Sequence, residues 1–195
     1  MPNLGVAAII VCSLLKVSSA GDILVQTNED QCTAFTSCTS CITQGVCTWC
    51  ITKSLCTRQQ CGNDNIIYPK NSQALLTGAE FCPRIVESPE RIFKHSQVHI
   101  FVVKLTQIYV YMAFTPWQCK IRVGDQDFEI KGILLGDSVY CDAFEMKNES
   151  DQAYIEGNVK VLWNFKKAFD GSLSFKICRC DLEPNCLACT KNKSK

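Results

Sequence analysis

The stretch CTAFTSCTSCITQGVCTWC, residues 32–50, contains five cysteines within nineteen residues. Two pairs have the Cys-x-x-Cys form, Cys38 with Cys41 and Cys47 with Cys50. This spacing occurs in zinc sites, in redox dithiols and in disulfide frameworks. The rest of the chain has to distinguish among these three uses.

The N-terminus indicates export. Residues 4–15 form an uncharged apolar run, LGVAAIIVCSLL, which is shorter than the ~20 residues that a membrane span needs. Small residues at Ser18 and Ala20 fit the site of signal peptidase. A buried helix is the alternative, but the polar, cysteine-rich chain that follows favours a signal peptide. We therefore predict a signal peptide over residues 1–20.

Charge and hydropathy exclude two classes of partner. The formal net charge of +1 falls to 0 once the signal peptide and its single cation, Lys16, are removed. No basic field is left to attract nucleic acid or an anionic membrane surface. The later apolar runs are too short to span a bilayer, so the sequence predicts a secreted, extracellular protein with no membrane span.

Export also decides the chemistry of the cysteines. Fourteen of the fifteen cysteines follow the signal peptide, and an oxidising lumen converts such an even set to disulfides. Only five residues separate the two Cys-x-x-Cys pairs, which is short for a four-cysteine zinc site, and neither pair lies in the strand–helix setting of a redox dithiol. The sequons at Asn148 and Asn192 are expected to be glycosylation acceptors on exposed loops.

The mature chain divides into three regions. The first, residues 32–82, contains eight cysteines and has poor apolar periodicity, so it needs covalent cross-links to fold. The second has the short β-rich runs and Gly-Asp turns of an immunoglobulin-like sandwich, in which Cys119 and Cys141 would join strands. Its predicted strands cover residues 98–105, 108–114, 119–123, 128–135, 138–144, 158–165 and 173–178. The third, residues 179–195, repeats the C-x5-C-x2-C spacing with which the first region begins.

These motifs carry a family resemblance. The pattern C-x5-C-x2-C-x5-C-x-W-C-x5-C-x4-C at 32–61, closed by FCPRI at 81–85, resembles the plexin–semaphorin–integrin (PSI) domain. Three further segments are similar to the first immunoglobulin-like (IPT/TIG) domain of plexins: WQC at 117–119, SVYC at 138–141 and VLWN at 161–164. CDLEPNCLACT at 180–190 resembles the start of the second plexin PSI domain. The resemblance implies a small, cysteine-knot-like, disulfide-rich PSI domain followed by an all-β IPT/TIG sandwich. The expected boundaries are a linker at 21–31, the PSI domain at 32–83, the sandwich at 84–178 and the start of a second PSI domain at 179–195.

The resemblance also implies a disulfide pairing, which the sequence alone leaves open. The implied bonds within the first region are Cys32–Cys47, Cys38–Cys82, Cys41–Cys56 and Cys50–Cys61. We expect Cys119–Cys141 as a fifth bond. The pairing of Cys178, Cys180, Cys186 and Cys189 stays open, because they can pair among themselves, bond another chain or belong to a truncated gene product.

No catalytic, metal or cofactor site is predicted. The chain lacks a nucleophile elbow, a phosphate loop and paired catalytic carboxylates, so we expect no enzyme. His95 and His99 lack the central glutamate of a zinc-protease helix and are expected to face solvent. Trp49 is expected to pack over the disulfides of the PSI domain. Trp117 and Trp163 are expected in the core, and Asp125, Asp127 and Asp137 are expected to be solvated turn residues.

The family resemblance implies a function without naming a binding residue. A PSI domain orients its neighbours as a rigid wedge, so we expect a secreted, non-enzymatic spacer and interaction module. Its partner would be an extracellular protein, with plexins and semaphorins as the candidates, and its effect would be to modulate semaphorin–plexin signalling. The plexin propeller, later IPT domains, membrane span and GTPase-activating region have no counterpart in this sequence. The alternative is therefore a fragment of a longer semaphorin receptor at the plasma membrane. A disulfide-rich hydrolase or inhibitor is a third hypothesis, for which the sequence offers no nucleophile–base pair.

Overall fold

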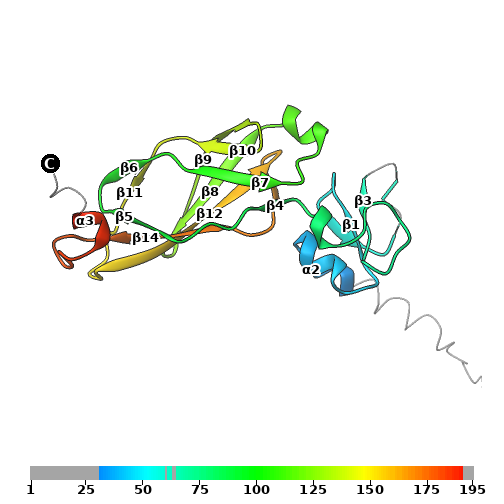
Figure 1. Ribbon diagram of the computed structural model, residues 1–195, viewed down its shortest axis with the longest axis horizontal. Coiled ribbons are helices and arrows are strands. Elements are labelled where there is room, and N and C mark those ends of the chain that lie inside the picture. Colours follow the sequence, from blue (N-terminus) through cyan, green and yellow to red (C-terminus); the bar gives the residue numbers. More distant parts are fainter. Residues whose placement is uncertain (1–30, 60, 63–64, 191–195) are drawn as a thin grey trace, which may run out of the picture.

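The computed structural model describes residues 31–59, 61–62 and 65–190. The predicted signal peptide, all but the last residue of the linker, and Asn192 lie outside this range. Figure 1 shows two units end to end, a small cysteine-rich unit and a larger β-sandwich, with the C-terminal helix α3 at the far end of the sandwich. None of the helices in the described part of the chain is long and apolar enough to cross a membrane.

The cysteine-rich unit is organised around a short three-stranded sheet with the order β2-β1-β3. Trp49 in the central strand lies opposite Cys56 and Ile67 and is only 4% exposed. Few other large apolar side chains are buried there, so sulfur atoms form much of the core. The elements are α2 (Cys38–Ile42), β1 (Thr48–Cys50), β2 (Leu55–Thr57), β3 (Ile66–Ile67) and the 3-10 helix η1 (Ala79–Phe81).

The sandwich is built from one continuous hydrogen-bonded sheet with β4 and β5 at its edges. Its strand order is β4-β7-β10-β9-β8-β12-β14-β5, with β13 paired to β12, and only the edge strand β5 runs parallel to its neighbour. A two-stranded ribbon of β6 and β11 lies beside it. The strands are β4 (Arg84–Ile85), β5 (Arg91–Lys94), β6 (Gln97–His99), β7 (Val102–Thr106), β8 (Trp117–Val123), β9 (Gln126–Leu135), β10 (Ser138–Cys141), β11 (Phe144–Met146), β12 (Tyr154–Trp163), β13 (Lys167–Ala168) and β14 (Leu173–Cys178).

The sheet folds over at Gly132. Strand β9 lies between β8 and β10, and in a flat sheet these two would be about 9–10 Å apart. The Cα atoms of Cys119 and Cys141 are nevertheless 5.8 Å apart and joined by a disulfide. Gly132 pairs with Cys141 on one side and with Trp117, two residues from Cys119, on the other, and a Cβ there would come within 2.9 Å of a Val139 methyl and 3.4 Å of Cys119 Sγ. A residue without a side chain therefore lets the two strands approach each other across the bend.

Aromatic side chains join the two layers of the sandwich core. The ring of Phe93 in β5 lies 5.6 Å from Phe101 and 5.8 Å from Phe175 in β14, both edge-to-face. Opposite Phe175, β12 has Gly157, where a Cβ would collide with that ring. The predicted fold class, a disulfide-rich unit followed by a mostly-β sandwich, is confirmed.

Residues 108–114 do not form the predicted strand. They contain the 3-10 helix η2 (Val110–Phe114), which connects β7 to β8. The Met112 amide donates to the Tyr109 carbonyl, which is the i to i+3 bond of a 3-10 turn. The side chains of Met112 and Tyr109 pack against the buried core, whereas Phe114 is 86% exposed. β-branched and aromatic residues predict a strand, but here they serve packing at a connection between layers. The predicted strand 173–178 forms with the expected ends as β14. The other predicted strands form with shifted ends, and the runs 98–105 and 138–144 each divide into two strands.

The C-terminal segment is tied back to the sandwich. Cys178, the last residue of β14, bonds to Cys186, and Cys180 bonds to Cys189 in α3 (Leu187–Thr190). The four cysteines whose pairing the sequence left open thus pair among themselves in the structure.

Candidate functional site: the interdomain junction and the distal end of the sandwich

The two units meet at the carboxylate of Asp170. Its Oδ1 accepts a hydrogen bond from the Cys38 amide at 3.1 Å, and its Oδ2 accepts one from the Thr39 amide at 2.7 Å. These amides belong to the first turn of α2, where backbone N–H groups have no partner within the helix. A carboxylate from the sandwich therefore satisfies two donors of the cysteine-rich unit, and its charge suits the positive end of the helix.

The backbone reinforces this contact. The Asp170 amide donates to the Pro83 carbonyl at 3.0 Å, and the Asp170 carbonyl accepts from the Ile85 amide at 2.8 Å. Nearby, the Lys167 ammonium lies 4.5 Å from the centre of the Trp163 ring and donates to the Thr52 carbonyl. The chain connection and the strand ends beside it therefore form one hydrogen-bonded assembly.

Apolar packing is continuous across the junction. A single cluster of buried side chains extends from the cysteine-rich unit into the sandwich, with Ile51, Met112 and Trp163 at the boundary. The gap left between the units has a volume of only about 10 Å³. Tyr109 donates its hydroxyl to the Phe81 carbonyl at 2.9 Å, and burial raises its pKa. A junction of this kind resists the interdomain motion that a small polar contact would allow.

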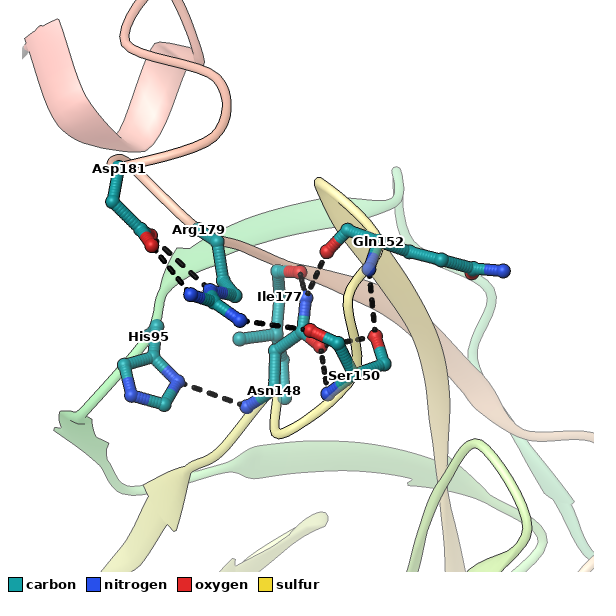
Figure 2. A network of polar contacts seen from close by, with 7 residues as sticks. All are labelled: His95, Asn148, Ser150, Gln152, Ile177, Arg179 and Asp181. Carbon is teal, nitrogen blue, oxygen red and sulfur yellow. Dashed lines mark hydrogen bonds and ion pairs between the residues drawn. The ribbon is translucent and has the colours of Figure 1, made fainter.

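A polar network fixes the other end of the sandwich, beside the C-terminal segment. Figure 2 shows Asn148 at its centre, with its amide group donating to the carbonyls of Gln152 at 3.1 Å and Ile177 at 3.3 Å. Its Oδ1 accepts from the amide and the hydroxyl of Ser150. Arg179 donates to the Ser150 carbonyl and pairs with Asp181. The β11–β12 loop is thereby tied to the end of β14.

The expectation of an exposed glycosylation acceptor at Asn148 was wrong. The side chain is 1% exposed, and both hydrogens of its amide are used inside the fold. A glycan bonded to this nitrogen would replace one hydrogen and require the side chain to leave the network. The sequon pattern cannot reveal this, because it reports the local tripeptide and not its burial.

The two histidines, expected to face solvent, are both partly buried. The Nδ1 of His95 accepts a hydrogen bond from the backbone N–H of Asn148, at 3.0 Å. His99 is half-buried, with ring centroids 4.6 Å from Phe93 and 5.2 Å from Phe101, and its Nε2 is buried without a hydrogen-bond partner. Burial, and secondarily the charge of Arg91, lower the pKa of His99 below 6.5. The chain turns between β5 and β6, so the two histidines do not share a strand face.

Acidification is expected to destabilise the sandwich through His99. The unfolded chain takes up a proton near pH 6.5, while the folded protein resists it, so the free energy of unfolding falls modestly as the pH drops below that value. Thermal unfolding of the wild type and of His99→Leu, followed from about pH 7.5 to about pH 5.5, measures the effect. The variant should lose part of the pH dependence. Identical pH profiles would contradict the role given to His99.

The three carboxylates expected in turns are exposed, but Asp127 lies in strand β9 opposite Arg122 and not in the turn, and two of the three are paired. Asp127 accepts a bidentate hydrogen bond from Arg122 and lies 3.0 Å from the Lys120 ammonium. These hydrogen bonds, first that of Arg122, hold the pKa of Asp127 well below its usual range. Asp137 accepts from the Ser138 hydroxyl and pairs with Lys104, which also lowers its pKa. Surface pairs of this type contribute little to stability.

The structure joins the cysteines in the pairs that the resemblance implies. The Cα atoms of the four bonds in the cysteine-rich unit are between 5.6 and 5.9 Å apart, within the usual range. All fourteen cysteines from Cys32 onward are in disulfides, so the two Cys-x-x-Cys pairs present no thiolate to a metal or a substrate. The bonds are Cys32–Cys47, Cys38–Cys82, Cys41–Cys56, Cys50–Cys61 and Cys119–Cys141.

Two junction residues escaped the sequence analysis. Asp170 lies in the segment FDGS, which predicts only a turn, and Lys167 lies in a polar stretch before it. The role of Asp170 depends on the position of α2. Thr39, whose amide donates to this carboxylate, is 131 residues away from it in the sequence. No local signal could have revealed such a contact.

Comparison with known proteins gives a fold. No protein-family model matches the chain, and no curated protein sequence matches it. Two solved structures of the full extracellular region of plexin A4 do match, with TM-scores of 0.60 and 0.59. Each is 15% identical and covers 76% of this chain, which itself spans 16% and 13% of the two plexin chains. This chain therefore has the fold of a segment of the plexin extracellular region, a PSI-like disulfide-rich unit followed by an immunoglobulin-like sandwich of the IPT/TIG kind.

Proposed function

We propose that the protein is a secreted, non-enzymatic module that holds a β-sandwich in a fixed orientation to a PSI-like unit. The observation that carries this proposal is the junction, in which Asp170 of the sandwich caps α2 and the apolar core is continuous between the units. Seven disulfides stiffen both units and the C-terminal segment, and they suit an extracellular environment. The proposal includes cleavage after Ala20, glycosylation at Asn192 and the domain boundaries expected from the sequence.

The proposed partner is a plexin or semaphorin ectodomain, and binding would modulate semaphorin–plexin signalling. The support is an analogy of fold with plexin A4, because a scaffold of the same architecture can present surfaces to the same molecules. A second candidate is a segment of a longer plexin-type receptor at the plasma membrane. It is favoured by the fact that the matching fold occurs inside a much longer extracellular chain.

Surface plasmon resonance with immobilised plexin and semaphorin ectodomains tests the partner. The secreted protein is injected at up to about 10 μM, a concentration that detects weak, transient extracellular contacts. We expect saturable binding to at least one member of either family, and its loss when the disulfides are reduced. Absence of binding throughout the panel would refute the semaphorin–plexin role.

A further inference from the structure

A groove opens at the end of the sandwich away from the cysteine-rich unit. It has a volume of about 590 Å³, within the range of ligand-binding clefts. The β8–β9 turn, strand β11 and the β11–β12 loop form its walls. This is the end of the molecule where Figure 1 places β6, β11 and α3, opposite β1 and α2.

The floor of the groove is apolar and partly exposed. The rings of Phe128 and Phe144 meet edge-to-face at 5.2 Å, and Phe128 is 37% exposed. Val123 and Ile155 complete the floor. An aromatic or aliphatic side chain inserted there would remove this surface from water, which is the main source of affinity in such a cleft.

The rim of the groove is acidic. Asp125, Glu145 and Glu149 line it with one cation, Lys147, which lies 3.3 Å from Glu145. The four side chains therefore sum to a charge of −2. Such a rim attracts lysine and arginine and repels the phosphates of nucleic acids and of anionic lipids.

The groove is formed before any ligand arrives. Asn148 is buried in the polar network and accepts hydrogen bonds from the backbone amide and the hydroxyl of Ser150 (Figure 2). Glu149 lies between these two residues in the chain. On the opposite wall, Gly124 adopts a positive φ of 53° in the β8–β9 turn and packs beside Ile155. Binding would therefore cost little ordering of the loop, which favours affinity.

We propose that this groove binds an extended segment of another extracellular protein in which an aromatic or aliphatic residue is flanked by lysine or arginine. The inference deepens the proposed interaction function, since it names the surface and the chemistry of the segment that is recognised. A protein segment fits better than a membrane or a nucleic acid, because the apolar floor needs a side chain and the rim needs cations.

Titration with a synthetic peptide tests the proposal. The ¹⁵N-labelled protein is observed by NMR while the unlabelled peptide Gly-Lys-Arg-Phe-Lys-Leu-Gly is added as the ligand, up to about 1 mM. We expect shift changes at Phe128, Phe144 and Ile155, weaker binding at about 0.3 M salt, and loss of binding when serine replaces the two apolar residues of the peptide or glutamate replaces its cations. The variant Glu145→Lys/Glu149→Lys should bind about tenfold more weakly.

The matched control is Glu80→Lys/Glu87→Lys, which changes the net charge equally at exposed positions outside the groove and should keep the wild-type affinity. Three results would overturn the proposal. They are unchanged groove resonances at the highest peptide concentration, equal binding of the serine or glutamate peptides, and self-association of the chain through the groove in sedimentation experiments. The peptide comes from no plexin or semaphorin, so failure of the partner screen and failure of this titration are separate results.

Discussion

Replacing both Cys38 and Cys82 with serine is expected to lower the free energy of unfolding of the cysteine-rich unit by ~4 kcal/mol. This bond closes a loop with a sequence separation of 44, the largest of the seven, so its loss releases the most conformational entropy in the unfolded chain. Since the unit has few large apolar side chains besides Trp49, Ile51 and Ile67, it should unfold at ambient temperature in the variant.

Chemical denaturation followed by NMR resolves the effect, because the indole signals of Trp49 and Trp117 report on the two units separately. The matched control is the variant Cys50→Ser/Cys61→Ser, which opens a loop with a separation of 11 and should cost ~3 kcal/mol. Equal stability of the wild type and the Cys38→Ser/Cys82→Ser protein would show that the unit does not depend on this bond.

Replacing Asp170 with alanine is expected to destabilise the protein by ~2 kcal/mol, because two α2 amides lose a charged acceptor. The second expected result is a change in dynamics, in which the two units begin to reorient independently. Thermal unfolding measures the first, and ¹⁵N relaxation of each unit measures the second.

The conservative variant Asp170→Asn keeps one oxygen acceptor and should fall between the wild type and Asp170→Ala. Asp142→Ala removes an exposed carboxylate elsewhere on the sandwich and should change stability by less than ~0.5 kcal/mol. If Asp170→Ala behaves like Asp142→Ala in both measurements, the carboxylate does not hold the junction together.

The sequence could predict the fold class because its strongest signals are local. Cysteine spacing and the CTWC step at 47–50 define a stapled unit, and alternating apolar runs bounded by Gly-Asp turns define a sandwich. The run at 108–114 misled because tertiary packing overrides β-propensity: Tyr109 and Tyr111 pack against the core from the 3-10 turn, while Val110 and Phe114 are left exposed. Here Met112 is fully buried at the junction, a demand that comes from the tertiary structure.

The candidate sites were less predictable, since each depends on residues brought together from distant segments. Asp170 meets α2, Asn148 meets Ile177, and Phe128 meets Phe144, whereas their local sequences predict a turn, a sequon and two strands. His99, a polar residue, was expected to face solvent, but its ring packs against the aromatic rings of Phe93 and Phe101. Such contacts follow from the packing of the sandwich, which no single motif records.

The central claim is that the two units form one rigid body, and residual dipolar couplings of the wild-type protein test it most directly. Backbone N–H couplings are measured in a weakly aligning medium for the cysteine-rich unit and for the sandwich. The packed junction predicts that one alignment tensor fits both sets with the interdomain orientation of the structure. Two tensors of clearly different magnitude would show independent motion of the units and contradict the claim.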